Sequence, residues 1–399
     1  MSAQILQPFG IKSQPANFQA LPPLSLYIHV PWCVRKCPYC DFNSHEAHGE
    51  IPDQAYVDAL LRDLDSALPL IWGRKIYSIF IGGGTPSLLS GDALSFLLTQ
   101  VRMRLPLAHE AEITLEANPG TVEAGKFVAF RDAGVNRLSL GIQSFNDIQL
   151  QALGRIHSGD EARRAIDIAQ SHFENINLDL MYALPKQTQE EALFDVQSAL
   201  SFSPQHLSCY HLTLEPNTLF AHHPPQLPDD DASSEMQLGI ETLMAEHGYE
   251  HYETSAFAKP GKRARHNLNY WLFGDYLGIG AGAHSKLSFH DKVIRQARHK
   301  QPKAYMEGVM LGAQVQSEQV LSKDDLAFEF MMNALRLNGG FEESLFQERT
   351  SLPLLLIRNE LQAAELKGLL VREAGRIAPT ERGRRFLNDL LQVFLAAEN

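Results

Sequence analysis

The stretch LSLYIHVPWCVRKCPYC, residues 24–40, decides how the chain is read. An apolar run that is typical of a buried strand ends just before Cys33, Cys37 and Cys40. Three thiolates this close in sequence can point into one small cavity, where soft sulfur ligands favour zinc, copper(I) or an iron–sulfur cluster over hard cations. A four-iron cluster normally takes four cysteines, but Phe42, not a cysteine, follows Asp41. A cluster held by three cysteines keeps one iron open to a small molecule.

A structural zinc site is the main alternative. His29 or His45 could complete a Cys3His site, although structural zinc sites more often show two CxxC pairs. The remaining cysteine, Cys209, lies far along the chain, and four cysteines in 399 residues are too few for a disulfide framework. The pattern therefore favours an oxygen-sensitive cluster.

Composition indicates an ordinary globular protein, with 44% hydrophobic and 21% charged residues. The net charge of −12 argues against general nucleic-acid binding. The sequence has no run of about 18 or more apolar residues, so we expect no membrane span. Its first residues lack the basic start and apolar stretch of a secretory signal. We expect residues 1–23 to be a poorly ordered lead-in and the protein to be cytoplasmic, which suits free thiols.

Short apolar runs alternate with amphipathic stretches from Leu24 to about Ser208. The strand candidates are LSLYIHV, IYSIFIGGG, AEITLEANP, RLSLGIQSF, INLDLMYALP and HLSCYHLTLEP, and helical patterns fill residues 56–68, 90–104, 121–133, 159–171 and 188–202. Six βα units in series predict a parallel α/β sheet. Either a doubly wound sheet or a partial (β/α)6 barrel satisfies this pattern, and both place function at the carboxyl ends of the strands.

The rest of the chain predicts an extension and a small C-terminal module. A Pro- and Asp-rich linker at 222–232 is followed by a helix at about 234–247 and a strand-like HYETSAFA. Past residue 305, Ser322 with Asp325 resembles a helix-starting capping box, and we expect Gly339 and Gly340 to stop that helix. We expect a hairpin next, and then a last helix that Thr380 opens. We expect a core at 24–220, an extension at 221–305 and a helical, winged-helix-like domain at 306–399.

Polar motifs follow several of the expected strands. GGGTPS, residues 82–87, allows a ligand to approach the backbone closely, although most glycine-rich turns are only turns. Glu116 is suited to accept hydrogen bonds from ribose hydroxyls, and Arg155 to pair with a carboxylate. Gln143 and Asp179 stand at similar strand ends. Each of these residues taken singly could equally have a structural role.

The stretch from Leu24 to Pro216 resembles the oxygen-independent coproporphyrinogen III dehydrogenase branch of the radical S-adenosylmethionine (SAM) proteins. The marks are YIHVPWCVRKCPYCDF, GGGTPS, EANPG, GIQSF with LGRIH, and DLMYALP. The resemblance implies a partial (β/α)6 barrel with a [4Fe–4S] cluster on Cys33, Cys37 and Cys40. It implies that the SAM site is lined by Tyr27, Tyr39, Gly84, Thr85, Pro86, Glu116, Gln143, Arg155 and Asp179.

Two features separate members of this branch. True dehydrogenases carry a further cysteine where this chain has Phe42, and HNLNYW, residues 266–271, resembles the heme-binding motif of the HemW heme chaperones. The resemblance implies a heme site at His266, Asn267, Tyr270 and Trp271. A neutral histidine is a common heme ligand, and Arg263 and Arg265 could pair with propionates. The alternative is a loop histidine with two aromatic residues buried in the core. YLGIGAGAHS, residues 276–285, shapes the active-site mouth or is only a tight connection.

We therefore expect a heme chaperone that transfers heme to apo-hemoproteins, without coproporphyrinogen dehydrogenase activity. The alternative is that dehydrogenase itself, in which an electron donor reduces the cluster and a 5′-deoxyadenosyl radical attacks propionate side chains. Whether the chain is an enzyme stays open, and we assign no catalytic residue because cofactors perform the difficult step. A homodimer and peripheral contact with membrane hemoproteins also stay open. A nucleic-acid-binding winged helix through Arg382, Arg384 and Arg385 is disfavoured, since Glu381 and Asp389 share that helix.

Overall fold

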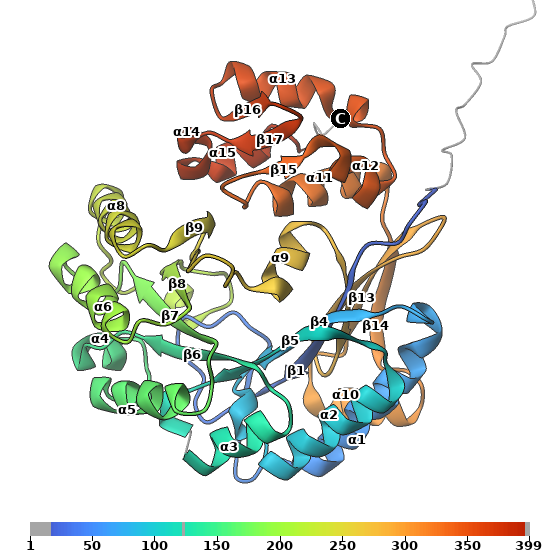
Figure 1. Ribbon diagram of the computed structural model, residues 1–399. Coiled ribbons are helices and arrows are strands. Elements are labelled where there is room, and N and C mark those ends of the chain that lie inside the picture. Colours follow the sequence, from blue (N-terminus) through green and yellow to red (C-terminus); the bar gives the residue numbers. More distant parts are fainter. Residues whose placement is uncertain (1–16, 122–123, 396–399) are drawn as a thin grey trace, which may run out of the picture.

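A computed structural model describes residues 17–121 and 124–395. Its centre is a run of parallel strands that pair in the order in which they occur along the chain (Figure 1). These strands are β1 (Leu24–Val30), β4 (Ile76–Gly83), β5 (Leu107–Ala117), β6 (Arg137–Gln143), β7 (Ile176–Tyr182) and β8 (His206–His211). A doubly wound sheet would reverse its strand order at a switch point. The consecutive order therefore confirms the partial barrel.

Helices cover the convex face of this curved sheet (Figure 1). They are α1 (Asp53–Ala67), α2 (Gly91–Arg104), α3 (Ala124–Asp132), α4 (Asp147–Ala152), α5 (Gly159–Gln170), α6 (Gln189–Ser201) and α8 (Asp230–Glu246), with short turns at η1 (Leu68–Ile71), η2 (Pro86–Leu88), η3 (Pro119–Thr121) and α7 (Leu219–His222). Helix α8 begins earlier than expected because the Asp229 side chain caps it, accepting a hydrogen bond from the Ala232 amide at 2.8 Å. The expected linker is correspondingly shorter.

The two faces of the sheet differ in polarity. On β6, Leu138, Leu140 and Ile142 belong to the main hydrophobic core, whereas Arg137 and Ser139, which alternate with them, line a cavity. Successive side chains of a strand point to opposite faces, and parallel sheets are ordinarily apolar on both. A polar inner face therefore shows that the barrel interior is built to hold polar groups.

Further strands, most of them antiparallel to their neighbours, extend the sheet at both edges, so that the described residues form one sheet of twelve strands. Strand β11 (Asp275–Ile279) pairs in parallel with β1, and β12 (His284–Ser288), β13 (Val293–Arg298) and β14 (Val315–Val320) follow it. On the other edge, β10 (Ala256–Ala258) and β9 (Glu250–Glu253) form a hairpin where we expected one strand. Residues 306–320, which we assigned to the C-terminal domain, complete α10 (Pro302–Met310) and form β14 of the main sheet.

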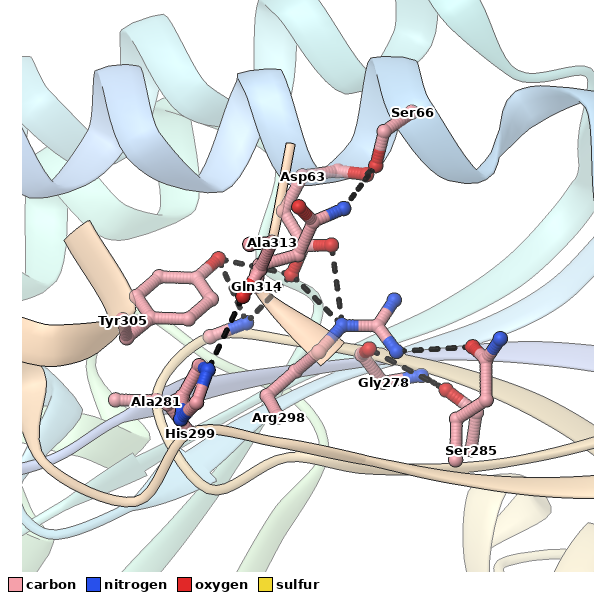
Figure 2. Close-up of polar contacts among 12 residues, drawn as sticks. Asp63, Ser66, Gly278, Ala281, Ser285, Arg298, His299, Tyr305, Ala313 and Gln314 are labelled. Carbon is pink, nitrogen blue, oxygen red and sulfur yellow. Dashed lines mark hydrogen bonds and ion pairs between the residues drawn. The ribbon is translucent and has the colours of Figure 1, made fainter. Parts of the chain in front are cut away.

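A buried ion pair ties α1 to the added strands (Figure 2). Arg298 Nε lies 3.1 Å from Asp63 Oδ1, and both side chains are almost fully buried. Tyr305 of α10 donates to Asp63 Oδ2 at 2.9 Å, and its hydroxyl accepts from the Gly280 amide at 3.1 Å. These contacts hold the turn after β11 against the barrel.

The C-terminal module has its own hydrophobic core. Its elements are α11 (Lys323–Ala334), β15 (Phe341–Glu342), α12 (Glu343–Thr350), η4 (Leu354–Ile357), α13 (Arg358–Leu366), β16 (Leu370–Glu373), β17 (Arg376–Pro379), α14 (Glu381–Arg385) and α15 (Leu387–Gln392). Ser322 and Asp325 form the expected capping box. The expected hairpin turns at Ala374 and Gly375, both with positive φ, and Thr380 caps α14 as expected.

Part of the expected lead-in is packed against this module. Phe18 is 3% exposed within the module's hydrophobic core, and its amide donates to the His290 carbonyl at 3.1 Å. Residues 1–16 of the expected lead-in lie outside the described residues. Over residues 17–121 and 124–395, none of the helices combines the length and the hydropathy that a membrane crossing requires.

Candidate functional site

The three clustered cysteines lie around one cavity of about 370 Å³, called here the cysteine cavity. Cys33 ends β2 (Trp32–Cys33), which pairs with β3 (His45–Glu46), so the loop between them closes on itself. Within the loop, the Cys40 amide donates to the Cys37 carbonyl at 3.1 Å. Burial raises the pKa of the Cys33 and Cys40 thiols.

This donor set fits a metal cluster, because a buried thiolate needs a neighbouring positive charge and soft metals prefer sulfur. Within residues 17–121 and 124–395, no three His, Cys, Asp or Glu side chains are grouped closely enough to hold a single metal ion. The three cysteines line the same cavity, where polar groups lie near two of the sulfur atoms. Cys40 Sγ lies 3.6 Å from Ser44 Oγ, and Cys37 Sγ lies 3.7 Å from Arg155 Nη1.

The glycine-rich loop after β4 presses directly on the cysteine segment. The Gly84 amide donates to the Val30 carbonyl and the Thr85 amide to the Trp32 carbonyl, both at 2.7 Å. A Cβ on Gly84 would lie 2.5 Å from the Trp32 carbonyl oxygen, and one on Gly83, whose φ is +119°, would meet the His29 ring at 2.6 Å. The glycines are therefore required for close approach, beyond the needs of a turn.

Two carboxylates face each other across the cysteine cavity. Glu116, near the end of β5, accepts a hydrogen bond from the Gly83 amide at 3.1 Å. Enclosure, and then the charge of Asp179, raise the pKa of Glu116 to about 8. Asp179 accepts bonds from Ser139 and Asn177, each at 2.8 Å, and burial raises its pKa. Such groups can accept hydrogen bonds from ligand hydroxyls with little competition from water.

Arg155 brings a cation to the cysteine end of the cavity. Its Nη2 donates to the Gly141 carbonyl at 2.8 Å, while its buried Nε has no partner among the described residues. Gln143 ends β6 with a φ of +67°, an unusual value for a residue other than glycine. The strand thus bends where its amide side chain meets the cavity.

The structure brings most residues of the expected SAM site together. The cysteine cavity is lined by Tyr39, Gly84, Thr85, Pro86, Glu116, Gln143, Arg155 and Asp179. Tyr27 lies on an adjoining cavity of about 720 Å³, the second cavity, which Glu116 also lines. Phe42, at the position that distinguishes the dehydrogenases, lines both cavities.

HNLNYW forms most of a helix, α9 (Arg265–Trp271), inside the barrel and not in a loop (Figure 1). His266 is 1% exposed and has partners at both ring nitrogens. Nδ1 lies 2.9 Å from Ser78 Oγ, and Nε2 lies 3.3 Å from the Tyr270 hydroxyl. Burial, and then the charge of Arg137, lower the pKa of His266 to about 3. The imidazole is therefore neutral at ordinary pH.

The other residues of this motif point to different neighbours. Asn267 lines the cysteine cavity and Tyr270 the second cavity. Trp271 lies under Arg336 of the C-terminal module, whose guanidinium carbon is 4.4 Å from a ring centroid. Helix α9 therefore contacts both cavities and the module.

The two arginines that could pair with propionates have protein partners in this structure. Arg263 pairs with Glu250 at 3.0 Å, and Arg265 donates to the Glu110 carbonyl at 2.6 Å. The glycine-rich segment after Tyr276 is a tight connection, because a Cβ on Gly280 would lie 2.4 Å from the His29 carbonyl oxygen. It also shapes a cavity mouth, since Gly282 and His284 line the second cavity.

Several residues on the inner face of the strands were not predicted as site residues from the sequence. The cysteine cavity is also lined by Arg137, Ser139, Asn177, Ser208 and Tyr210. Polar residues at every second position of RLSLGIQ, NLD and HLSCY could have signalled this inner face. Lys36 and Lys300, which come from separate loops, and His284, the first residue of β12, line the second cavity and leave no comparable pattern.

Comparison with known families agrees with this geometry. Residues 27–197 match the model of the Radical SAM superfamily, and residues 321–386 match the HemN C-terminal domain. Among solved structures, coproporphyrinogen III oxidase (HemN) from Escherichia coli, described as a radical SAM enzyme, superposes with a TM-score of 0.80 at 25% identity. The match covers 94% of this chain and 90% of that one.

Curated relatives are more similar. The heme chaperone HemW of Escherichia coli (strain K12) is 52% identical over 94% of this chain and 99% of that protein. The heme chaperone HemW of Haemophilus influenzae is 49% identical over 95% of this chain and 99% of that protein. Because identity this high extends over nearly the full length of both proteins, the chain belongs to the HemW family of radical-SAM proteins.

Proposed function

We propose that the protein is a heme chaperone, which binds heme and transfers it to apo-hemoproteins without oxidising coproporphyrinogen. The observation that carries the proposal is the position of α9. Its HNLNYW motif lies inside the same barrel as the three cysteines, and Asn267 lines the cavity that they share. The nearly full-length relatives named as heme chaperones support the same function.

The cysteine cavity fits the two cofactors of a radical-SAM protein. Cys33, Cys37 and Cys40 would hold a [4Fe–4S] cluster, and the backbone of the glycine loop, together with Glu116 and Arg155, would hold SAM. Bound there, the cluster and SAM together supply one-electron chemistry. Glu116 is placed to accept ribose hydroxyls, and Arg155 to pair with the carboxylate of the methionine moiety.

His266 is the residue that we assign to the heme iron. Ser78 engages Nδ1 at 2.9 Å and is itself held by Ser25 at 2.8 Å, whereas the contact of Nε2 with Tyr270 is longer, at 3.3 Å. A hydrogen bond at one ring nitrogen orients the other toward a metal. Nε2, whose contact with Tyr270 is the longer one, would be the atom that binds the iron.

The test is a heme titration of the full-length protein after anaerobic reconstitution of its cluster, followed by absorbance. His266→Ala should weaken heme binding at least about tenfold, because the imidazole that would bind the iron is lost. His172→Ala, which removes the same side chain from the turn after α5, is the control and should bind heme as the wild type does. An unchanged heme spectrum and affinity in the His266 variant would remove this ligand assignment.

Coproporphyrinogen dehydrogenation remains the second candidate, because the fold superposes on coproporphyrinogen III oxidase over most of its length. The same reconstituted sample, given SAM, a reductant and coproporphyrinogen III, should form no protoporphyrinogen. Product formation at a rate above the cluster-free sample would contradict the proposed function and favour the enzyme.

A further inference from the structure

Arg137 is a buried cation whose side chain forms no hydrogen bond or ion pair within the part of the chain that the structure describes. It begins β6, is 2% exposed and lines the cysteine cavity. Among the described residues, no acceptor lies within hydrogen-bond distance of its buried Nε. Arginine is rarely buried unless it is paired, because an uncompensated charge away from water costs several kcal/mol.

Other buried cations of this chain are paired. Arg298 lies 3.1 Å from Asp63, and Lys286 lies 3.0 Å from Asp275, with each side chain at most 1% exposed. The fold therefore compensates a buried charge where that charge serves structure. Arg137 differs from both in facing a cavity.

The polar neighbours of Arg137 form no hydrogen bond with it. Thr114, its register partner on β5, also has a buried hydroxyl without a partner among the described residues. Both oxygens of Asp179 already accept bonds from Ser139 and Asn177. Glu112 uses Oε1 to accept the Arg265 and His266 amides at the start of α9.

Arg137 lies away from the cysteine end of the cavity, but its charge acts on one of the proposed SAM residues, Asp179, where it opposes the rise in pKa that burial causes. Arg155 holds the Gly141 carbonyl at the cysteine end of the cavity, and Arg137 precedes Gly141 by four residues of β6. At roughly 3.3 Å per residue, this places the two backbone positions roughly 13 Å apart. We call the end of the cavity at which β6 begins its floor. The charge of Arg137 reaches His266 and His206, whose pKa values it helps to lower, after burial.

We propose that Arg137 and Thr114 form a carboxylate site on this floor, and that it binds one propionate of heme. The inference rests on the proposed function, since heme offers propionates as its carboxylates. A guanidinium matches a carboxylate with two parallel hydrogen bonds, and the Thr114 hydroxyl can donate a third. His266 is buried close enough to this floor for the charge of Arg137 to help lower its pKa, after burial.

The first test measures the melting temperature of the full chain without heme. Arg137→Gln removes an unpaired buried charge and should leave the melting temperature unchanged or raise it. Arg62→Gln, the same change on the exposed side of α1, is the control. A fall of several degrees in the Arg137 variant alone would mean that the guanidinium is part of the structural framework, and would overturn the inference.

The second test compares heme with heme dimethyl ester, in which both carboxylates are masked. Wild-type protein and Arg62→Gln should bind heme at least about tenfold more tightly than the ester, a difference of about 1.4 kcal/mol. Arg137→Gln should bind heme only as tightly as the ester and should bind the ester as the wild type does. Arg137→Lys keeps the positive charge but lacks the planar guanidinium. Its heme affinity should lie between those of the wild type and Arg137→Gln.

The outcomes separate the inference from the proposed function. If wild-type protein binds heme through His266 but treats heme and ester alike, or if Arg137→Gln keeps full heme affinity, the carboxylate site is wrong and the chaperone function stands. If wild-type protein binds no heme at all, both fall. Unchanged SAM binding in Arg137→Gln is required, because a loss there would place Arg137 at the SAM site.

Discussion

Short contacts at single positions of the site leave no space for a different side chain. Gly84 lies against the backbone of Trp32, and Glu116 is bonded to the amide of Gly83. Each ties the glycine loop to another strand end. The cysteine segment, the loop and the first carboxylate therefore form one packed unit, and small changes in it should be felt both in stability and in cofactor binding.

Gly84→Ala should lower stability by about 1–3 kcal/mol, since its Cβ meets a backbone oxygen that cannot give way easily. Gly339→Ala is the matched control, because nothing lies within 4 Å of a Cβ at that position. Urea unfolding of both variants checks the prediction, with iron content after reconstitution as a second measurement. Equal midpoints for the two variants would show that the loop is looser than its contacts indicate.

Glu116 predicts a pH dependence of stability. Its pKa is about 8 in the folded protein, against 4.5 for an ordinary glutamate. The folded state therefore keeps a proton that the unfolded state releases, and the free energy of unfolding falls as pH rises from about 4.5 to 8. Glu116→Gln has no such proton to release, so it does not lose this stability as pH rises. The difference in melting temperature between Glu116→Gln and the wild type, both without cofactors, should therefore be more favourable to the variant at about pH 8.5 than at about pH 5.5.

At the scale of elements, α9 depends on a strand for its start. Ala264 at its N-cap has no side-chain oxygen, and Glu112 of β5 takes that role by accepting the Arg265 and His266 amides at 3.0 and 3.2 Å. A helix of this length is not stable alone. Its position inside the barrel therefore follows from contacts with β4 and β5 and with the C-terminal module.

Glu112→Ala should destabilise the protein by about 1–2 kcal/mol, the usual cost of losing a helix cap. Glu112→Gln retains a carbonyl oxygen and should cost less. Glu110→Ala is the control, because this neighbour is exposed and its carboxylate lies 3.6 Å from the exposed Arg265 guanidinium. Denaturant unfolding measures all three, and a Glu112→Ala midpoint equal to that of Glu110→Ala would exclude the capping role.

At the scale of the whole molecule, buried charge pairs join the barrel to its added strands. Asp63 and Arg298 are far apart in sequence and meet between α1 and β13 (Figure 2). The Gly280–Ala281 turn that they help to hold precedes His284 of the second cavity. The buried pair that stabilises the contact between α1 and β13 therefore also helps to set the shape of the cavity mouth.

Arg298→Met should cost about 3–5 kcal/mol, because it leaves the Asp63 carboxylate buried and unpaired. The double variant Asp63→Leu with Arg298→Met should recover much of this loss. Glu307→Gln, which breaks an exposed pair with Lys303, should cost no more than about 1 kcal/mol. Chemical unfolding tests the series, and a double variant as unstable as the single one would contradict the account.

Patterns local to the chain determined the strands and the cysteine end of the site. Short apolar runs such as RLSLGIQ and LSLYIHV located all six central strands. The cysteine spacing and the glycine loop are local as well. Local patterns could not show that residues 251–258 form a hairpin or that residues 315–320 complete the main sheet, since pairing partners come from distant segments.

The sequence by itself therefore determined an α/β chain with three clustered thiols and the residues that gather around them. Only the tertiary structure decided that the central strands follow one another in a partial barrel, that α9 lies inside it, and that Arg137 faces a cavity without a partner. The physical reason is that burial and charge compensation depend on atoms brought together from remote positions. A polar residue on a strand leaves the same pattern in the sequence whether its hydrogen-bond partner is a protein group or a ligand.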